Sequence, residues 1–215
     1  MEAHIAMIPF EDLQIYLPKY LSPGSEQSLF EELKQFPENI DDRLYLSPEY
    51  LEPDIIYQGD GIDGLLVVNL PETEIKKVPG MIFSNTCDID ERNKRLFPST
   101  LVYSPIFNLE KYKEGLIESK IKDERSIEDH ISSIRKQRIT QMFYLPKGGA
   151  LSNESIVFLD RVNSCDNSFF EREKIRNMRL FALSNYGLYL FIFKLSVHFT
   201  RITEGVDRSP HSTLS

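Results

Sequence analysis

The stretch VPGMIFSNTCDIDERNKRLFPSTLVYSPIF, residues 78–107, holds two apolar runs on either side of a dense polar segment. Runs such as MIF and LVYSPIF, rich in Ile, Val, Phe and Tyr, are typical of buried strands. The polar segment SNTCDIDERNKR therefore predicts a loop between two strands. Small and polar residues at strand ends are where sites are often built. Two interpretations stay open: a functional site on a rigid sheet, or a solvated hairpin loop.

Short apolar runs of the same kind recur on both sides of this stretch. A helical insertion interrupts them at residues 109–137, with a break expected near residues 122–125 and a second helix start indicated by Ser126 and Asp129. The closing run LSNYGLYLFIFKLSVHF predicts a helix over residues 184–199. Because this helix is apolar nearly all round, we expect it to be buried. The remaining predicted strands are DIIYQ (54–58), GLLVVNL (64–70), ITQMFYL (139–145) and ESIVFLDRV (154–162).

Residues 10–36 predict two short helices, and Leu29, Leu33 and Phe36 recur at helical spacing in the second of them. Together the elements predict an α+β, β-rich fold, a small and strongly bent barrel with helices packed on it. The expected organisation is an acidic N-terminal helical segment (1–54), a barrel domain (55–203) and a flexible tail (204–215).

Charge and cysteine content restrict the class of protein. The chain of 215 residues has a net charge of −8, and residues 1–60 alone carry 13 acids and 3 bases. An acidic segment repels phosphates and is suited to a solvated surface or a basic partner. Two cysteines far apart in sequence do not predict a disulfide framework, and the N-terminus shows no export signal. We therefore expect a cytoplasmic protein that does not span a membrane.

The segment Gly59-Asp60-Gly61-Ile62-Asp63-Gly64 matches the G-x-G-x-x-G pattern of dinucleotide-binding folds. That pattern binds phosphate when a helix follows it, and here the strand-like run LLVVNLP follows. Two aspartates inside the segment would also repel phosphate. We interpret it as a hairpin turn.

The residues of this loop suggest a thiol nucleophile, polar turns or a metal site. The carboxylates next to Cys87 disfavour a thiolate, so we expect this cysteine to be a small core residue and not a nucleophile. Asn85, Asp88 and Asp90 are expected to make side-chain-to-backbone turns. A metal site is not expected, because Arg92, Lys94 and Arg95 compete for the same carboxylates.

Residues 130–153 contain no acid and hold a local basic stretch. Basic side chains interleaved with aromatic ones bind single-stranded nucleic acid, whereas bases alone commonly complement the end of a helix. The residues concerned are Arg135, Lys136, Arg138, Lys147, Phe143 and Tyr144.

The order of the runs resembles the MazF/PemK toxin family. The residues that carry the resemblance are Gly59-Asp60, LLVVNLP, VPGMIFSN, LVYSPIF and SIVFLDRV, within about residues 55–165. The resemblance implies an SH3-like barrel, a homodimer and RNA cleavage without a metal or other cofactor. Val78 and Phe107 stand where the family has its catalytic Arg and its catalytic Thr or Ser. The S-N-T-C-D-I signature also resembles uncharacterised bacterial proteins, some expected in mobile or defence contexts.

Two functions follow as expectations. The first is a binding module in a toxin–antitoxin or defence context, with a protein or RNA as its partner and without the family's catalytic groups. Its candidate binding residues are Ser84, Asn85, Thr86, Asp88, Asp90, Arg92, Arg135 and Arg138. The alternative is a metal-independent endoribonuclease with relocated catalytic groups, drawn from Asn85, Asp88, Arg92, Arg135, Arg138 and Asp160.

Overall fold

The structure is a computed structural model, and it describes residues 41–121 and 123–200. The two helices predicted within residues 10–36, and the tail predicted for residues 204–215, lie outside the described residues. Within residues 41–54 of the predicted helical segment, the structure has two short 3-10 turns, Asp42–Leu44 and Pro48–Tyr50.

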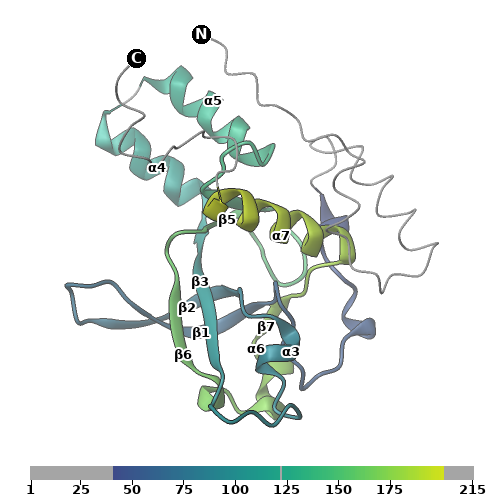
Figure 1. Cartoon of the computed structure of the whole chain (residues 1–215). Coiled ribbons are helices and arrows are strands. Elements are labelled where there is room, and N and C mark those ends of the chain that lie inside the picture. The colour runs from purple at the N-terminus through teal and green to yellow at the C-terminus, as the bar shows by residue number, and fades with distance from the viewer. Residues whose placement is uncertain (1–40, 122, 201–215) are drawn as a thin grey trace, which may run out of the picture.

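The fold is α+β, built on one antiparallel sheet of seven strands (Figure 1). The strand order is β4-β5-β3-β2-β1-β7, and β6 pairs with β3 beside this path. The strands are β1 (Gly61–Val68), β2 (Ile75–Ile82), β3 (Thr100–Asn108), β4 (Met142–Leu145), β5 (Ser155–Phe158), β6 (Asn163–Asp166) and β7 (Arg179–Phe181). The helices are α3 (Thr86–Ile89), α4 (Leu109–Ser119), α5 (Glu124–Arg135), α6 (Ile175–Met178) and α7 (Asn185–Thr200).

Strand β3 organises the sheet because it pairs with three other strands. One edge of β3 pairs with β2, with Tyr103 opposite Ile82. The first half of β3 also pairs with β6, and its last three residues pair with β5. The Ser104 hydroxyl donates to the carbonyl oxygen of Phe158 at 2.7 Å, at the point where β3 passes from one partner to the other. A single bent strand therefore joins both halves of the sheet.

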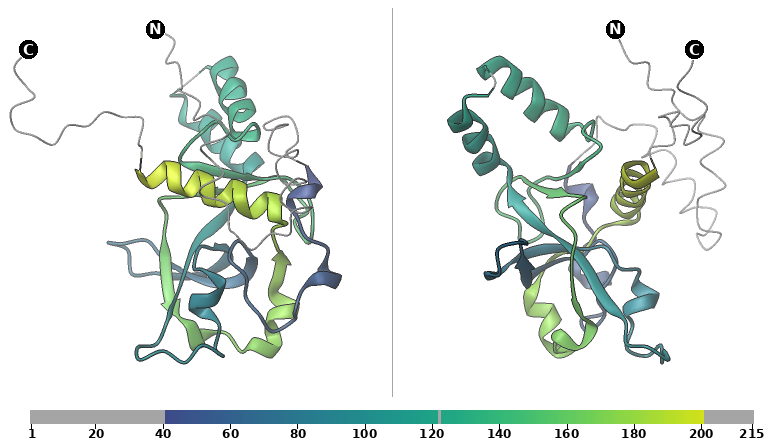
Figure 2. Two further views of the ribbon diagram at one scale, coloured as in Figure 1. Left: turned by 45° about the vertical axis from the view of Figure 1, so that its right-hand side comes forward. Right: turned by 60° about the vertical axis from the view of Figure 1, so that its left-hand side comes forward.

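Three apolar clusters hold the helices on this sheet. Helix α7 covers a cluster that includes Met81, Phe143 and Phe191, while α4 and α5 cover another that includes Ile131 and Ile156. A third cluster lies around β1, α3 and α6. The views in Figure 2 show α4 and α5 at one end of the molecule and α3 towards the other. This separation decides which predicted site residues can meet.

Several local predictions needed correction. Residues 54–58, predicted as a strand, are irregular, and the turn of the glycine-rich segment lies at Tyr57–Asp60, where Gly59 has a φ of +87°. Gly61 already begins β1, so a strand and not a helix follows, as predicted. Helix α5 begins one turn earlier than Ser126 indicated, because Asp123 is its N-cap and accepts the Ser126 N–H at 2.9 Å. Strand β6 was missed because it is short and polar, and β7 because it has only three residues.

Helix α7 is not buried all round. Ser184 acts as its N-cap, since its hydroxyl accepts the Gly187 N–H at 3.2 Å. One face packs on the core through Tyr186, Leu190 and Phe191, and the opposite face is open to solvent. An apolar sequence alone does not indicate which face of such a helix meets the core.

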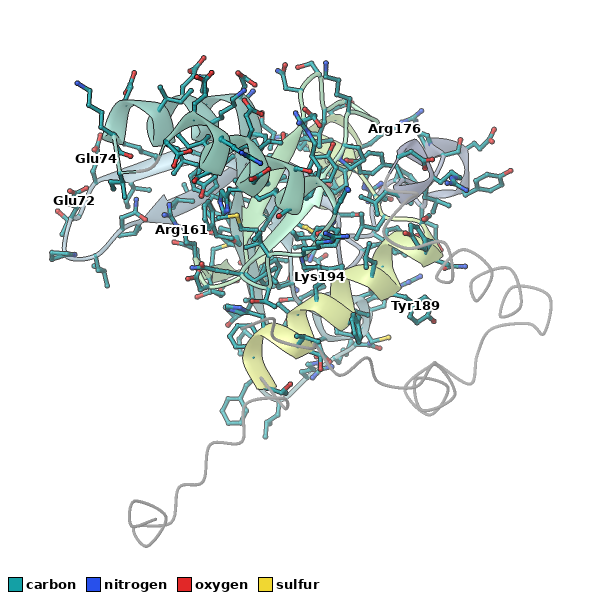
Figure 3. All side chains as sticks on the ribbon, turned by 90° about the horizontal axis from the view of Figure 1, so that it is seen from above. Glu72, Glu74, Arg161, Arg176, Tyr189 and Lys194 are labelled. Carbon is teal, nitrogen blue, oxygen red and sulfur yellow. The ribbon has the colours of Figure 1, made fainter. Side chains whose placement is uncertain are left out.

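The Gln137 side chain forms the hydrogen bonds that a further strand would form at the edge of β4. The Gln137 amide accepts the Tyr144 N–H at 3.0 Å and donates to the Tyr144 carbonyl oxygen at 2.8 Å, as a neighbouring strand would. Lys194 of α7 is buried, and its ammonium group donates to Gln137 Oε1, to the Gln137 and Ile139 carbonyl oxygens at 2.9–3.0 Å, and to that of Met142. Burial lowers the pKa of Lys194 to about 7. In Figure 3, Lys194 lies between α7 and the body of the protein.

A second buried charge lies beside β1. Asp60 and Arg179 form an ion pair of 3.0 Å in which the side chains are 0% and 7% exposed. Asp60 Oδ2 also accepts the Tyr57 N–H, while Asp60 Oδ1 is buried without a hydrogen-bond partner. Burial raises the pKa of Asp60 to about 7, although the Arg179 guanidinium opposes this change.

We expect Asp60 to make stability depend on pH between about 4 and 7. In this range the folded state holds the Asp60 proton more tightly than the unfolded state does, so the free energy of unfolding should fall as pH rises. Urea titrations of the wild type and of Asp60→Asn at several pH values should show a shallower fall in the variant. Exposed Asp63→Asn is the matched control and should follow the wild type. Parallel curves for all three proteins would contradict the expectation.

Candidate functional site

The candidate site is the loop between β2 and β3, which projects from the sheet. Ser84 joins the two strands, since its hydroxyl accepts the Val102 N–H at 2.8 Å and donates to the Thr100 carbonyl oxygen at 3.2 Å. Asn85 is the N-cap of α3 and accepts the Cys87 N–H at 2.9 Å. The Thr86 hydroxyl accepts the Gln58 N–H at 3.0 Å. Short polar side chains thus hold the start of the loop in one conformation.

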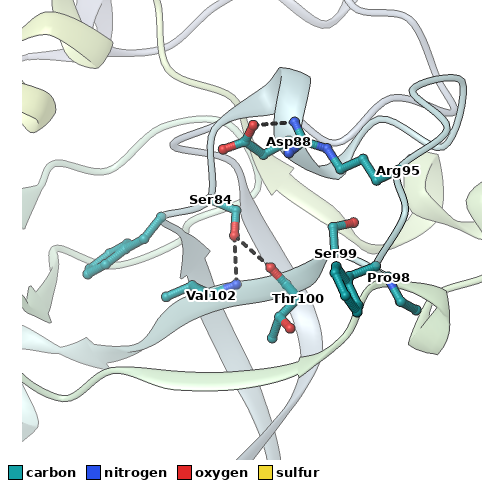
Figure 4. A pocket seen from close by; sticks show the side chains of 9 residues that line it. Ser84, Asp88, Arg95, Pro98, Ser99, Thr100 and Val102 are labelled. Atoms are coloured by element: carbon teal, nitrogen blue, oxygen red, sulfur yellow. Dashed lines mark hydrogen bonds and ion pairs between the residues drawn. The ribbon is translucent and has the colours of Figure 1, made fainter.

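A hollow of about 450 Å³ lies between this loop and the first half of β3 (Figure 4). It combines aromatic and aliphatic walls with a few polar groups, as binding sites commonly do. The lining residues are Phe83, Ser84, Asp88, Arg95, Phe97, Pro98, Ser99, Thr100 and Val102.

Both arginines of the loop are paired with carboxylates of the same loop. Arg95 contacts Asp88 at 2.5 Å, and Arg92 contacts Asp90 at 2.7 Å. The hydrogen bond from Arg92 lowers the pKa of Asp90 to about 2. These ion pairs bring each guanidinium close to a carboxylate, which weakens its attraction for a phosphate.

Apolar side chains lie at the tip of the loop, next to these pairs. Leu96 is 92% exposed and Phe97 is 76% exposed, and Phe97 lines the hollow. Large apolar side chains grouped on a surface are typical of an interaction site. The sequence signal for this surface is the run Leu-Phe-Pro directly after the charged residues.

Two residues far along the chain fix the loop from behind. The Asn167 side chain donates to the Ile89 carbonyl oxygen and to the Ser99 hydroxyl, both at 2.9 Å. Arg172 donates to the same Ile89 oxygen and to Asn167 Oδ1, and it pairs with Glu91 at 3.0 Å. Sequence reasoning missed both residues, because nothing local in NSFFERE indicates a contact about 80 residues away. Asn167 and Arg172 therefore fix the loop against the body of the protein, and it is not a free hairpin.

The structure does not bring all predicted site residues together. The six candidates between Ser84 and Arg92 share this loop. Arg135 is the last residue of α5 and Arg138 follows the helix, and Figure 1 shows α5 well away from α3. Arg135 forms a two-bond ion pair with Glu154 at 2.7–2.8 Å. Asp160 accepts a hydrogen bond from Gln141 at 2.5 Å. The candidate residues therefore fall on two separate parts of the fold, since the insertion projects from the opposite end of β3.

Two predictions within the loop also needed correction. Cys87 is exposed and does not belong to the core, because the first turn of α3 directs Ile89 inward instead. Asp88 makes an ion pair and not a side-chain-to-backbone turn, whereas Asn85 and Asp90 make the predicted turns, Asp90 by accepting the Arg92 N–H.

Within residues 41–121 and 123–200, no group of three or more His, Cys, Asp or Glu side chains is arranged to hold a metal ion. In the same part of the chain, no helix combines the length and apolar character needed to cross a membrane. No protein-family model matches the chain, and no curated protein matches it in sequence.

Proposed function

We propose that this protein is a protein-binding module, and that the loop of residues 84–100 with the hollow beside it is its docking site. The observation that carries the proposal is the contrast within the loop: its arginines pair with its own carboxylates, while Leu96 and Phe97 face solvent. An RNA-binding surface depends on cations that are available to phosphates. A surface whose arginines are already paired and whose Leu96 and Phe97 are exposed fits a protein segment with apolar side chains better.

We further propose that the protein is a divergent relative of the MazF/PemK proteins, in which the bent sheet corresponds to their SH3-like barrel. It would act in the cytoplasm of a bacterium, in a toxin–antitoxin or defence context. Val78 and Phe107, at the positions of the family's catalytic groups, are engaged in packing. Val78 pairs with Leu65 across β1 and β2, and the Phe107 ring lies 5.3 Å from that of Phe158. These side chains cannot move a proton or stabilise a phosphate, which supports binding as the function.

A random-peptide display selection tests the proposal. We expect the wild-type protein to select peptides rich in apolar residues, whose dissociation constants fluorescence anisotropy would then measure. Phe97→Ser should weaken these peptides by about tenfold or more, because a central aromatic contact is lost. Leu70→Ser is the matched control, since Leu70 is exposed on the β1–β2 hairpin and should leave binding unchanged. Selection of the same peptides by Phe97→Ser with equal affinity would overturn the docking site.

The endoribonuclease alternative predicts a different outcome. Purified protein would be incubated with mixed RNA in the presence of a chelator. Specific cleavage that disappears in Asp88→Ala and in Arg92→Ala would replace the proposed function with the alternative. Since the Asp88–Arg95 pair is exposed, Asp88→Ala should fold normally and lose no more than about 1 kcal/mol of stability.

A further inference from the structure

An arginine rests on aromatic rings where the helical insertion meets the sheet. Arg161 follows β5, and the central carbon of its guanidinium lies 4.3 Å from the ring centroid of Phe158 and 5.3 Å from that of Phe107. The two rings pack edge to face, with centroids 5.3 Å apart. Figure 3 shows Arg161 on the side of the molecule from which the β1–β2 hairpin projects. Cation–π attraction to two rings holds the guanidinium in place.

The N–H groups of Arg161 are available to a ligand. The side chain is exposed, and within residues 41–121 and 123–200 no carboxylate forms an ion pair with it. The neighbouring carboxylate of Asp160 accepts a hydrogen bond from Gln141 at 2.5 Å instead. By contrast, Arg135 is occupied by its two bonds to Glu154. A cation–π contact uses the face of a guanidinium, so the donors at its edge stay free.

A hydroxyl group lies at the same cluster. The ring of Tyr112 in α4 packs on Phe158 with centroids 5.8 Å apart, so Tyr112 and Arg161 share one aromatic neighbour. The Tyr112 hydroxyl is hydrogen-bonded to His130 Nε2 of α5 at 3.1 Å. Burial raises the pKa of Tyr112, and the positive charge of Arg161 opposes this change, so that charge acts on the hydroxyl. The hydroxyl therefore keeps its proton at neutral pH.

These donors suit a phosphate group. When His130 donates to the phenol oxygen, the Tyr112 O–H can donate to a ligand. Two N–H groups of Arg161 and this O–H then match the three terminal oxygens of a phosphate monoester, whereas a carboxylate has only two oxygens. The rings of Phe107 and Tyr112 are only partly buried, so the organic part of an ester can pack against them.

We propose that Arg161 and Tyr112 bind a phosphate monoester beside the rings of Phe107 and Phe158, with His130 hydrogen-bonded to the Tyr112 hydroxyl. The phosphate meets the edge of the guanidinium, and the organic group meets the rings. The site lies at the end of β3 that leads into α4, away from the loop of residues 84–100. This inference is therefore independent of the function proposed for that loop.

Isothermal titration calorimetry of the full-length protein with phenyl phosphate tests the inference. Arg161→Gln should weaken binding by about tenfold or more, because charge-assisted hydrogen bonds are lost. Tyr112→Phe keeps the ring and removes only the hydroxyl, and it should weaken binding about fivefold. Arg176→Gln is the matched control, since Arg176 is exposed on α6, lies well away from Arg161 in Figure 3 and should leave binding unchanged. Circular dichroism reports whether each variant keeps its fold.

Three results would overturn the inference. One is that the wild type does not bind phenyl phosphate at millimolar concentrations, or that Arg161→Gln or Tyr112→Phe binds it as tightly as the wild type does. Another is equal affinity for benzoate, since the site would then not select a phosphate. The third is equal affinity for inorganic phosphate, since the rings would then contribute no contact with an organic group.

Discussion

Lys194→Met should lower the free energy of unfolding by about 3 kcal/mol, within a range of roughly 2–5 kcal/mol. The substitution keeps most of the side-chain volume but removes the ammonium group that donates to Gln137 Oε1 and to three backbone carbonyl oxygens. Those oxygens would be left buried without this donor. Relief from burying a charge recovers part of the loss, which is why the expected value is below the sum of the separate bonds.

Urea unfolding followed by circular dichroism measures this change, and Lys111→Met is its matched control. Lys111 is exposed on α4, so the same chemical change there should stay within about 0.5 kcal/mol. Equal midpoints for the two variants would show that the Lys194 contacts contribute little to stability. Gln137→Ala should weaken the same edge of β4, because it removes both side-chain bonds to Tyr144.

Gly187→Ala should destabilise the protein by about 2 kcal/mol, although alanine is the better helix former by about 1 kcal/mol. A Cβ at position 187 would lie 2.4 Å from the Leu44 carbonyl oxygen. That oxygen also accepts the Ser184 N–H, so it cannot move away without breaking the contact that starts α7. Steric overlap with a fixed backbone atom therefore outweighs helix propensity.

Gly115→Ala should instead raise the free energy of unfolding. Gly115 lies in α4, and a Cβ there would meet nothing within 4 Å. Only the higher helix propensity of alanine then changes stability, and the free energy of unfolding should rise by about 0.5–1 kcal/mol. A shift of the thermal midpoint in the same direction for both variants would contradict the role assigned to the contact between Leu44 and α7.

Much of the fold could be predicted from local sequence. The run before Ser84 forms the end of β2, the run from Thr100 to Asn108 forms β3, and residues 109–137 contain α4 and α5. Such elements are specified by neighbouring residues in the sequence: by the alternation of apolar residues, by the Gly and Pro residues that end an element, and by N-cap residues. The place of the candidate loop followed from the same signals, since it is simply what lies between two strands.

The tertiary structure decided the contacts between residues that are far apart in the chain. The sequence determined by itself that α7 is an apolar helix, but only packing on β4 and η2 (Asp42–Leu44) selected the face that holds Lys194 and left Phe199 outside. Likewise the loop could be located from sequence, whereas its attachment to Arg172 and the exposure of Cys87 could not. Local patterns specify an element through its own backbone and side-chain preferences. Burial and polar pairing depend on which distant strand or helix comes to lie against it, and no short window of sequence contains that information.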